Sequence, residues 1–351
     1  MDFAFTDEQK MIADTAREFF RKHATSASTR KAMADDGVDR PLWTSFCTEL
    51  GLAGAVNPEE FGGAGLGMVE LAIIAEAAGS QVSAIPLLGQ AMATGALMGG
   101  ATDEQKQKWL GSIASGDTIC TVASSDDALE DDGKLTGLVT HTPHGAAADL
   151  LVVLGKSRSW LVPLDGSGVT FKRPVTMDQT RPLATVVLDG AFCEPLGETH
   201  SAKDAAMRAG LIVLSAEALG GAQETLDRTV AYSQERVQFG RPIGSFQAYK
   251  HRLADMLVEI EQARSAVYWA ACAMDENDPT ADFALYAAKS LCADTYFRCA
   301  GDMIQLHGGI GFTWEHDAHL FFKRARAVQS LLGTGEEYRE RIAQIVLGDA
   351  A

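Results

Sequence analysis

The sequence lacks any run of the roughly 18 apolar residues that a membrane-spanning helix needs, so we expect no transmembrane segment. Residues 1–10 also lack the basic stretch followed by an apolar stretch that marks a secretory signal. These two absences predict a cytoplasmic protein.

Cysteine is sparse and scattered. The six cysteines lie at positions 47, 120, 193, 272, 292 and 299, and none forms a Cys-x-x-Cys pair. We therefore expect buried, reduced thiols rather than a disulfide framework. No set of cysteine and histidine has the spacing of zinc ligands, so the sequence predicts no metal site.

Positive charge is scarce as well, with 30 Lys and Arg against 47 Asp and Glu and a formal net charge of -17. An acidic surface repels a phosphate backbone, which argues against nucleic-acid binding, although a local basic patch can still bind an anionic ligand. The 351 residues are 46% hydrophobic and 22% charged, as in folded chains of two or three domains. The sequence has no internal repeat and no low-complexity tract.

Residues 1–117 read as a helical domain. Thr6 is a candidate N-cap, and Gln9 three positions later completes a capping box. A glycine-rich passage at 60–67 interrupts the helical pattern. Further helices are expected at about 68–78 and from near Thr102.

Residues 118–200 read as a β domain, because short β-rich segments alternate with turns such as Asp165-Gly166 and Asp189-Gly190. The expected strands are 119–123, 150–154, 160–163, 169–171 and 185–188. They do not alternate with long helices, which favours a small antiparallel sandwich or barrel over a doubly wound parallel sheet.

Residues 201–351 are expected to form a helical bundle. Long amphipathic stretches cover approximately 205–238, 247–274, 282–307, 316–330 and 336–347. The predicted fold class is therefore α+β and mostly α, in the order helical domain, β domain, four-helix bundle.

One distinctive string runs from Tyr232 to Gln247 and contains Arg236-Val-Gln-Phe-Gly240. We expect Gly240 to end a helix in a left-handed conformation, with Pro242 discouraging continuation. Arg236 is then expected in the last helical turn, where a cation suits the helix dipole.

A second string, Gln305-Leu-His-Gly-Gly309, is followed by Ile-Gly-Phe-Thr-Trp-Glu. Adjacent glycines after a long helix are typical of a helix C-terminus. They also allow backbone amides to approach a phosphate closely.

Together the two strings resemble the acyl-CoA dehydrogenase family, and the resemblance extends over the whole chain, including 5–9 and 60–63. It implies a tetramer with FAD at a dimer interface and an acyl-CoA substrate. In this family both strings reach across to the adenosine diphosphate part of FAD on the neighbouring subunit. The positions that the resemblance assigns to cofactor binding are Arg236, Gln238, Phe239, Gln305, Gly308 and Gly309.

The catalytic base of the family has no counterpart. The reaction removes a proton from the α carbon, so it needs a carboxylate there. The position of the usual C-terminal glutamate holds Leu332, and the alternative position on the helix before Arg236 holds Gly210. Glu217, about two turns further on, is the nearest carboxylate of that helix, and we expect it to have a packing role. We assign no catalytic residue.

The flavin-ring half of the site is also changed. Residues 121–128 lack the Glu, Pro and Gly of the family's ring-holding string, and residues 139–143 replace its Trp-x-Thr/Ser strand. His141 and His144 lie beside this segment, and we expect both to be solvated.

This pattern resembles the short, degenerate subunit of heteromeric α2β2 acyl-CoA dehydrogenases of bacterial steroid side-chain degradation. The resemblance implies a homologous partner subunit that supplies the base, FAD shared between the two, and electron-transfer flavoprotein as acceptor. Two alternatives remain open. One is a self-sufficient homotetramer with a displaced base such as Glu217, and the other is a flavin-free scaffold.

Overall fold

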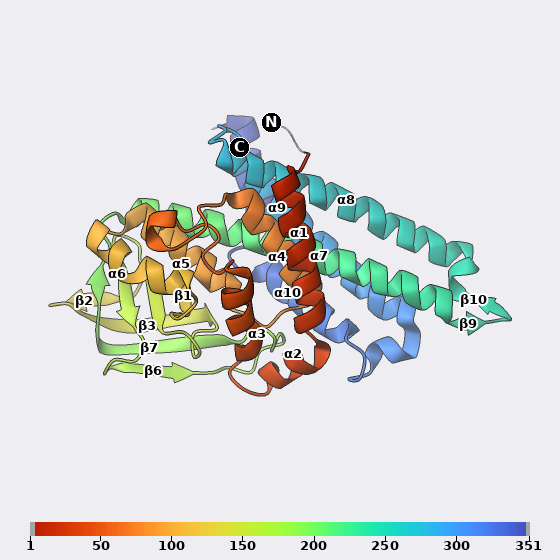
Figure 1. Cartoon of the computed structure of the whole chain (residues 1–351), viewed down its shortest axis with the longest axis horizontal. Coiled ribbons are helices and arrows are strands. Elements are labelled where there is room, and N and C mark those ends of the chain that lie inside the picture. The colour runs from red at the N-terminus through yellow and green to blue at the C-terminus, as the bar shows by residue number, and fades with distance from the viewer. Residues whose placement is uncertain (1–3, 349–351) are drawn as a thin grey trace. The chain divides into compact units, whose positions relative to one another are not determined.

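A computed structural model describes residues 4–348 of the chain (Figure 1). Its α-helices are α1 (Asp7–His23), α2 (Ser26–Met33), α3 (Arg40–Ser45), α4 (Met68–Ser80), α5 (Leu87–Gly100), α6 (Asp103–Ala114), α7 (Thr199–Glu235), α8 (Gln247–Asp275), α9 (Ala281–His307), α10 (Ala318–Ser330) and α11 (Gly335–Leu347). Its strands are β1 (Cys120–Ser124), β2 (Leu129–Asp131), β3 (Lys134–Pro143), β4 (Leu150–Leu154), β5 (Ser159–Pro163), β6 (Val169–Lys172), β7 (Leu183–Phe192), β8 (Glu194–Pro195), β9 (Val237–Gln238) and β10 (Arg241–Pro242). Single helical turns are η1 (Phe46–Leu50), η2 (Glu59–Phe61), η3 (Ile243–Ser245) and η4 (Gly308–Phe312).

The chain forms two compact units. The first, which we call the bundle unit, contains the described residues up to Ser26, Met68–Ser83 and everything from Leu214 onward. The second, the β unit, contains Ala27–Gly67 and Ala84–Val213.

The β unit contains two four-stranded sheets, ordered β1-β4-β5-β8 and β2-β3-β7-β6. The strand pairs are antiparallel except for β1 and β4, which are parallel. The predicted mostly helical fold with a small antiparallel β region is confirmed. The parallel pair was not predicted, and it arises because the β2–β3 hairpin between β1 and β4 belongs to the other sheet.

Helices α5 and α6 pack beside β1 within this unit. The buried Gln90 side chain donates from Nε2 to the carbonyls of Ile113 and Thr118, and its Oε1 accepts from the Cys120 amide at 2.9 Å. A Cβ at Gly89 would lie 2.3 Å from the Cys120 carbonyl oxygen, so a glycine is needed where α5 meets the strand.

The bundle unit is built from the second part of α7 and from α8 to α11, with α1 and α4 packed on it. Its helices begin where the sequence supplies caps. The predicted capping box of Thr6 and Gln9 is present, and Thr334 and Glu337 form another at the start of α11. The helical start predicted at Thr102 in the β unit is likewise a capping box.

Helices α4 and α7 touch through their backbones inside the bundle unit. A Cβ at Gly79 would lie 2.2 Å from the Glu217 carbonyl oxygen, and one at Gly220 would lie 1.9 Å from the Glu76 carbonyl oxygen. Any side chain at either glycine would force the two helices apart.

Helix α7 is the one described helix that is long and apolar enough to cross a membrane. The sequence analysis did not predict it, because its apolar residues do not form an unbroken run. In the structure, 83% of its most apolar window is buried against the rest of the protein. Core helices of folded proteins share this composition, so the feature is weak evidence of a membrane span.

The six cysteines are free thiols, but the prediction that they are buried holds for only four of them. Four of them are buried, at positions 120, 193, 292 and 299, and Cys47 and Cys272 are half-buried.

Candidate functional site

The first string of the sequence follows the end of helix α7. The helix ends at Glu235, and the Arg236 amide donates to the Tyr232 carbonyl at 2.9 Å. Strands β9 and β10 then form a hairpin at the end of the long helices (Figure 1). Its two turn residues, Phe239 and Gly240, have φ values of 55° and 77°.

This hairpin corrects two expectations. Gly240 does adopt a left-handed conformation, but in a two-residue turn rather than as a helix cap, and Arg236 follows the last helical residue instead of lying in the last turn. Two consecutive positive φ values suit the turn of a tight hairpin. The Ile243 amide donates to the Arg236 carbonyl at 2.8 Å, and this hydrogen bond closes the open end of the hairpin.

The second string ends helix α9, as predicted. Gly308 has φ 62° and ψ −140°, and its amide donates to the Gln305 carbonyl. A Cβ on Gly308 or Gly309 would have no protein atom within 4 Å. Packing within the chain therefore does not require glycine at 309, and the exposed backbone here is open to a ligand.

Two tyrosines hold the ends of the helices together, so both strings lie at the same end of the bundle unit. The Tyr249 hydroxyl of α8 donates to the Leu306 carbonyl at 3.0 Å. The Tyr232 ring of α7 stacks on the His307 ring with centroids 4.4 Å apart. Burial, with a contribution from Tyr232, raises the pKa of Tyr249 to about 12, so its hydroxyl stays protonated.

His307 is buried at this junction. Its Nδ1 lies 2.8 Å from the Met303 carbonyl, which fixes the proton on Nδ1. Burial lowers the pKa of His307, and the charges of His316 and Arg228 act in the same direction. The imidazole is therefore neutral near pH 7, and it fills space without adding charge.

Large apolar side chains are exposed around both strings. Phe239 is 90% exposed and Phe312 82%, and they are accompanied by Val237, Ile310 and Trp314. We call these five residues the aromatic end patch. Exposed apolar patches on a folded chain mark binding surfaces. Except for Phe239, sequence reasoning did not single these residues out, although aromatic residues beside both strings were the available signal.

The side chains that could hold an anionic cofactor point to solvent. Arg236, Gln238 and Gln305 are exposed, and Gln238 Nε2 donates only to the neighbouring Val237 carbonyl at 2.9 Å in the contacts observed. An arginine fork and open glycine amides suit a pyrophosphate, and exposed aromatic rings suit an adenine. These residues fit the adenosine diphosphate part of FAD.

The positions where a catalytic base is expected hold no acid. Leu332 follows α10 with φ 59°, and its carbonyl accepts a hydrogen bond from the Tyr338 hydroxyl at 2.5 Å. Gly210 lies buried on α7.

Glu217 lies in a buried ion pair. Arg324 Nη1 of α10 donates to Glu217 Oε1 at 2.7 Å, and the two residues are 2% and 6% exposed. A guanidinium beside the carboxylate stabilises its charged form and occupies one of its oxygens. This arrangement suits packing between α7 and α10, as expected, and lacks the free carboxylate of a base.

In the β unit, strand β1 is joined to β3 where the family holds its flavin ring. The Thr121 hydroxyl donates to the Pro143 carbonyl at 2.6 Å, and the Ser125 hydroxyl donates to the Leu138 carbonyl at 3.0 Å. These two hydroxyls are therefore used within the chain itself and are not available to the ring half of FAD, whereas Ser124, Asp126 and Asp127 of the same segment are exposed.

The expectation for the two histidines holds for one of them. His141 is exposed, but His144 is only 2% exposed, so the prediction that it is solvated is wrong. The turn after β3 folds inward, because the His144 amide donates to the Pro182 carbonyl at 2.9 Å.

Comparison with known proteins gives consistent matches. The family model described as acyl-CoA dehydrogenase, N-terminal domain, matches residues 6–117, and the one described as acyl-CoA dehydrogenase, C-terminal domain, matches residues 202–347. The chain is 37% identical over 339 residues to "Acyl-CoA dehydrogenase IpdE2" of Mycobacterium tuberculosis, which covers 96% of each. Among solved structures, the ChsE4–ChsE5 complex from the same organism matches with a TM-score of 0.91 and 28% identity, covering 100% of both chains. The Tcur3481–Tcur3483 steroid ACAD G363A variant matches with a TM-score of 0.89 and 28% identity, over 98% of this chain and 99% of the other.

Proposed function

Because this chain belongs to the acyl-CoA dehydrogenase family of FAD-dependent oxidoreductases, we propose that it completes the FAD site of a homologous partner subunit and has no catalytic base of its own. The two subunit types form an α2β2 heterotetramer in the cytoplasm. Together they introduce an α,β double bond into an acyl-CoA.

The observation that carries this proposal is the contrast between the two halves of the site. Arg236, the hairpin and the Gly308-Gly309 backbone are open and fit a dinucleotide. At the same time, Leu332 stands where a carboxylate is needed, and a leucine side chain cannot accept a proton.

Within the complex, this chain binds and orients rather than reacts. Arg236 supplies a charge-assisted contact to the pyrophosphate, and the aromatic end patch excludes water around the adenosine. Bound FAD supplies the hydride acceptor, and the partner supplies the base that takes the α proton.

The proposed substrate class includes steroid side-chain CoA thioesters. It is supported by the likeness to the Tcur3481–Tcur3483 steroid ACAD. Electron-transfer flavoprotein is the proposed electron acceptor.

A homotetramer that uses Glu217 as base is the alternative. The Arg324 ion pair argues against it, because the Glu217 carboxylate is held and buried. A flavin-free scaffold is the third possibility, and the open glycine backbone at the bundle end argues against it.

The test is to express the chain alone and together with each candidate acyl-CoA dehydrogenase subunit from the same genome, and to count flavin per subunit. We expect a colourless or flavin-poor lone chain and a yellow, active complex. A yellow lone chain with turnover would establish the homotetramer. A pair that does not associate or binds no flavin would favour the scaffold.

A further inference from the structure

The bundle unit contains a cleft of about 1420 Å³, and its lining includes no residue of the two strings and neither Gly210 nor Leu332. Its walls come from α1, α4, α7 and α8, together with Phe5. Ligand sites for small molecules measure roughly 300–1,000 Å³, so the cleft is large enough for one.

Small side chains keep the cleft open. The lining includes Ala13, Ala77, Gly220, Ser265 and Ala266. Larger apolar groups come from Phe5, Ile73, Tyr268 and Trp269. The interior can therefore take the apolar body of a ligand.

One wall of the cleft is basic. Lys10, Arg17 and Arg21 of α1 all line it, and two of them also contact exposed acids of the same helix, Lys10 Nζ lying 3.1 Å from Asp7 Oδ1 and Arg17 Nη1 3.7 Å from Asp14 Oδ1. Spacings of seven and four residues place them on one face of the helix, along roughly 16 Å. On the α8 wall, burial and the Glu76 carboxylate raise the pKa of Tyr268 well above its usual value, although the charges of Arg264 and Arg17 oppose this, so the hydroxyl stays protonated.

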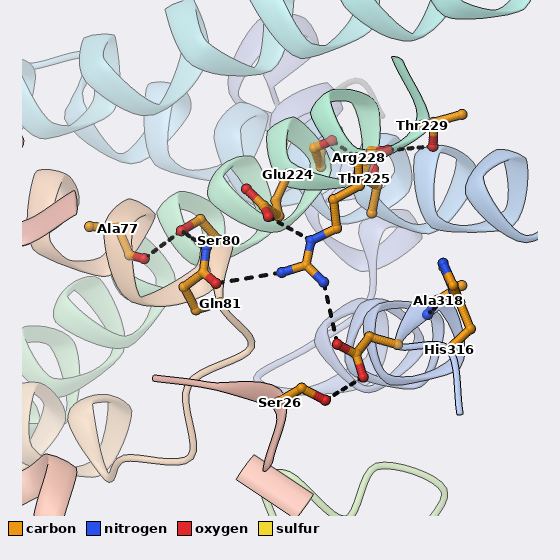
Figure 2. A network of polar contacts seen from close by, with 12 residues as sticks. Ser26, Ala77, Ser80, Gln81, Glu224, Thr225, Arg228, Thr229, His316 and Ala318 are labelled. Carbon is orange, nitrogen blue, oxygen red and sulfur yellow. Dashed lines mark hydrogen bonds and ion pairs between the residues drawn. The ribbon is translucent and has the colours of Figure 1, made fainter. Parts of the chain in front are cut away.

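The acids of the facing walls are largely neutralised. Glu76 accepts from Arg264 Nη1 at 2.6 Å and from the Tyr268 hydroxyl at 2.5 Å. Glu224 accepts from Arg228 Nε at 2.6 Å. The same arginine also donates to Gln81 and to Asp317, and Asp317 accepts a second hydrogen bond from the Ser26 hydroxyl (Figure 2). Asp227 alone among the acids lining the cleft is engaged only by an amide, Gln223 Nε2 at 2.9 Å, in the contacts observed.

We propose that this cleft binds an amphipathic anion, with the apolar body between α4 and α8 and the anionic head on the basic face of α1. The head is the carboxylate of a free acid or the phosphates of a CoA thioester. The site is separate from the FAD-completing site, so it stands whether or not the proposed function holds.

The test uses a brominated octadecanoic acid, which quenches the fluorescence of a nearby tryptophan, and the full chain in the assembly in which it purifies. Trp269 lines the cleft, so saturable quenching is expected in the wild type and is expected to disappear in Trp269→Phe. Quenching that persists in Trp269→Phe, or that does not saturate, overturns the proposal.

Two variant pairs test the head and the body of the ligand. Arg17→Gln/Arg21→Gln should weaken binding about fivefold, and Lys22→Gln, on the same helix but outside the cleft, should change it less than about twofold. Ser265→Phe fills the cleft from an exposed position and should abolish binding, whereas Gln262→Phe, also exposed and one turn away, should not. Equal affinity in wild type and both cleft variants would overturn the assignment.

Competition identifies the source of the anion. Octadecanoic acid and its CoA thioester are each added against the probe, with octadecanol as the uncharged control. Displacement by either anion supports the site and names its head group. Displacement by octadecanol with equal affinity shows that the basic face has no role and overturns the proposal.

Discussion

Arg236 is the residue on which the cofactor contact depends most, because it is exposed beside the hairpin and carries the only permanent charge among the residues assigned to FAD. A charge-assisted contact to a pyrophosphate is worth roughly 1.5–3 kcal/mol. Arg236→Ala should therefore lower FAD affinity of the assembled complex about tenfold or more. The amount of flavin that the complex releases on dilution measures this affinity. Lys250→Ala, an exposed cation early in α8, is the control and should retain flavin. Unchanged occupancy in Arg236→Ala would contradict the assignment.

Leu332 tests whether the base alone is missing. Leu332→Glu restores a carboxylate, but β1 remains bonded to β3 through Thr121 and Pro143, so the ring half is still absent. A base accelerates the reaction only when the α carbon and the acceptor are aligned. We expect no acyl-CoA oxidation by the lone variant in a dye-reduction assay. Turnover above the wild-type background would show that the ring half is less important than we infer.

At the scale of elements, Glu217 and Arg324 couple α7 to α10. Removing one partner of a buried ion pair leaves the other charge unpaired and costs about 3–5 kcal/mol. Glu217→Gln should lower the free energy of unfolding by this order in urea titrations. Glu217→Leu/Arg324→Leu should recover most of the loss.

The same variant separates packing from catalysis. If Glu217 only packs, the assembled complex containing Glu217→Gln should keep its kcat within about twofold, measured well below the unfolding temperature. A loss of kcat of a hundredfold or more with intact flavin would support Glu217 as the base.

Lys289 couples α9 to α10. Its ammonium is fully buried and donates to the Val328 carbonyl at 2.7 Å. Burial lowers the pKa of Lys289 from 10.5 to about 8. Between these values the unfolded chain binds more protons than the folded chain, so deprotonation favours folding as the pH rises.

The stability of the wild type relative to Lys289→Met should consequently rise by roughly 1 kcal/mol per pH unit above about pH 8. Below about pH 8 the wild type should carry the full cost of burying the charged ammonium. Urea unfolding of both proteins at several pH values measures the difference. Lys250→Met, which removes an exposed lysine, should give a flat difference. A flat difference for Lys289→Met as well would show that the lysine is not desolvated.

The long elements were predictable, and the local geometry of the site was not. Amphipathic patterns placed α8 and α9 to within one residue at each end, because the bundle buries one helical face repeatedly. Strand β3 was missed because Gly137 and register shifts interrupt its alternation. The turn at Phe239 was missed because a large aromatic residue is a poor signal for positive φ. The ion pair of Glu217 joins residues 107 positions apart, which spacing cannot reveal.

At the scale of the whole molecule, some apolar helix faces are buried within the chain and others are exposed. The face of α7 with Leu211, Leu214, Ala218 and Ala222 is buried in the chain itself. On α8, Ile260 and Ala263 are buried, but Leu257 and Val258 are 47% and 57% exposed. Together with the aromatic end patch, these residues are candidates for an interface between subunits.

We expect the lone chain to be poorly soluble or weakly dimeric, and to unfold at a higher temperature when mixed with its partner at equal molarity. An obligate interface buries about 2,000 Å² or more, and its binding energy adds to folding stability. Val258→Asp should reduce this rise, and Gln262→Asp, on an exposed polar position of the same helix, should not. A monodisperse lone tetramer with no rise on mixing would favour the homotetramer.

The contact of α4 with α7 at Gly79 and Gly220 has a mechanical consequence. Where two main chains are in direct contact, no side chain lies between them whose rotamer could absorb a displacement, so we expect α4 and α7 to move together as a rigid pair. The other two walls of the cleft, α1 and α8, contact this pair through side chains such as Gln9 and Arg264, which can change rotamer. Differences in the thickness of a bound molecule are then accommodated by α1 and α8, while the spacing of α4 and α7 stays constant.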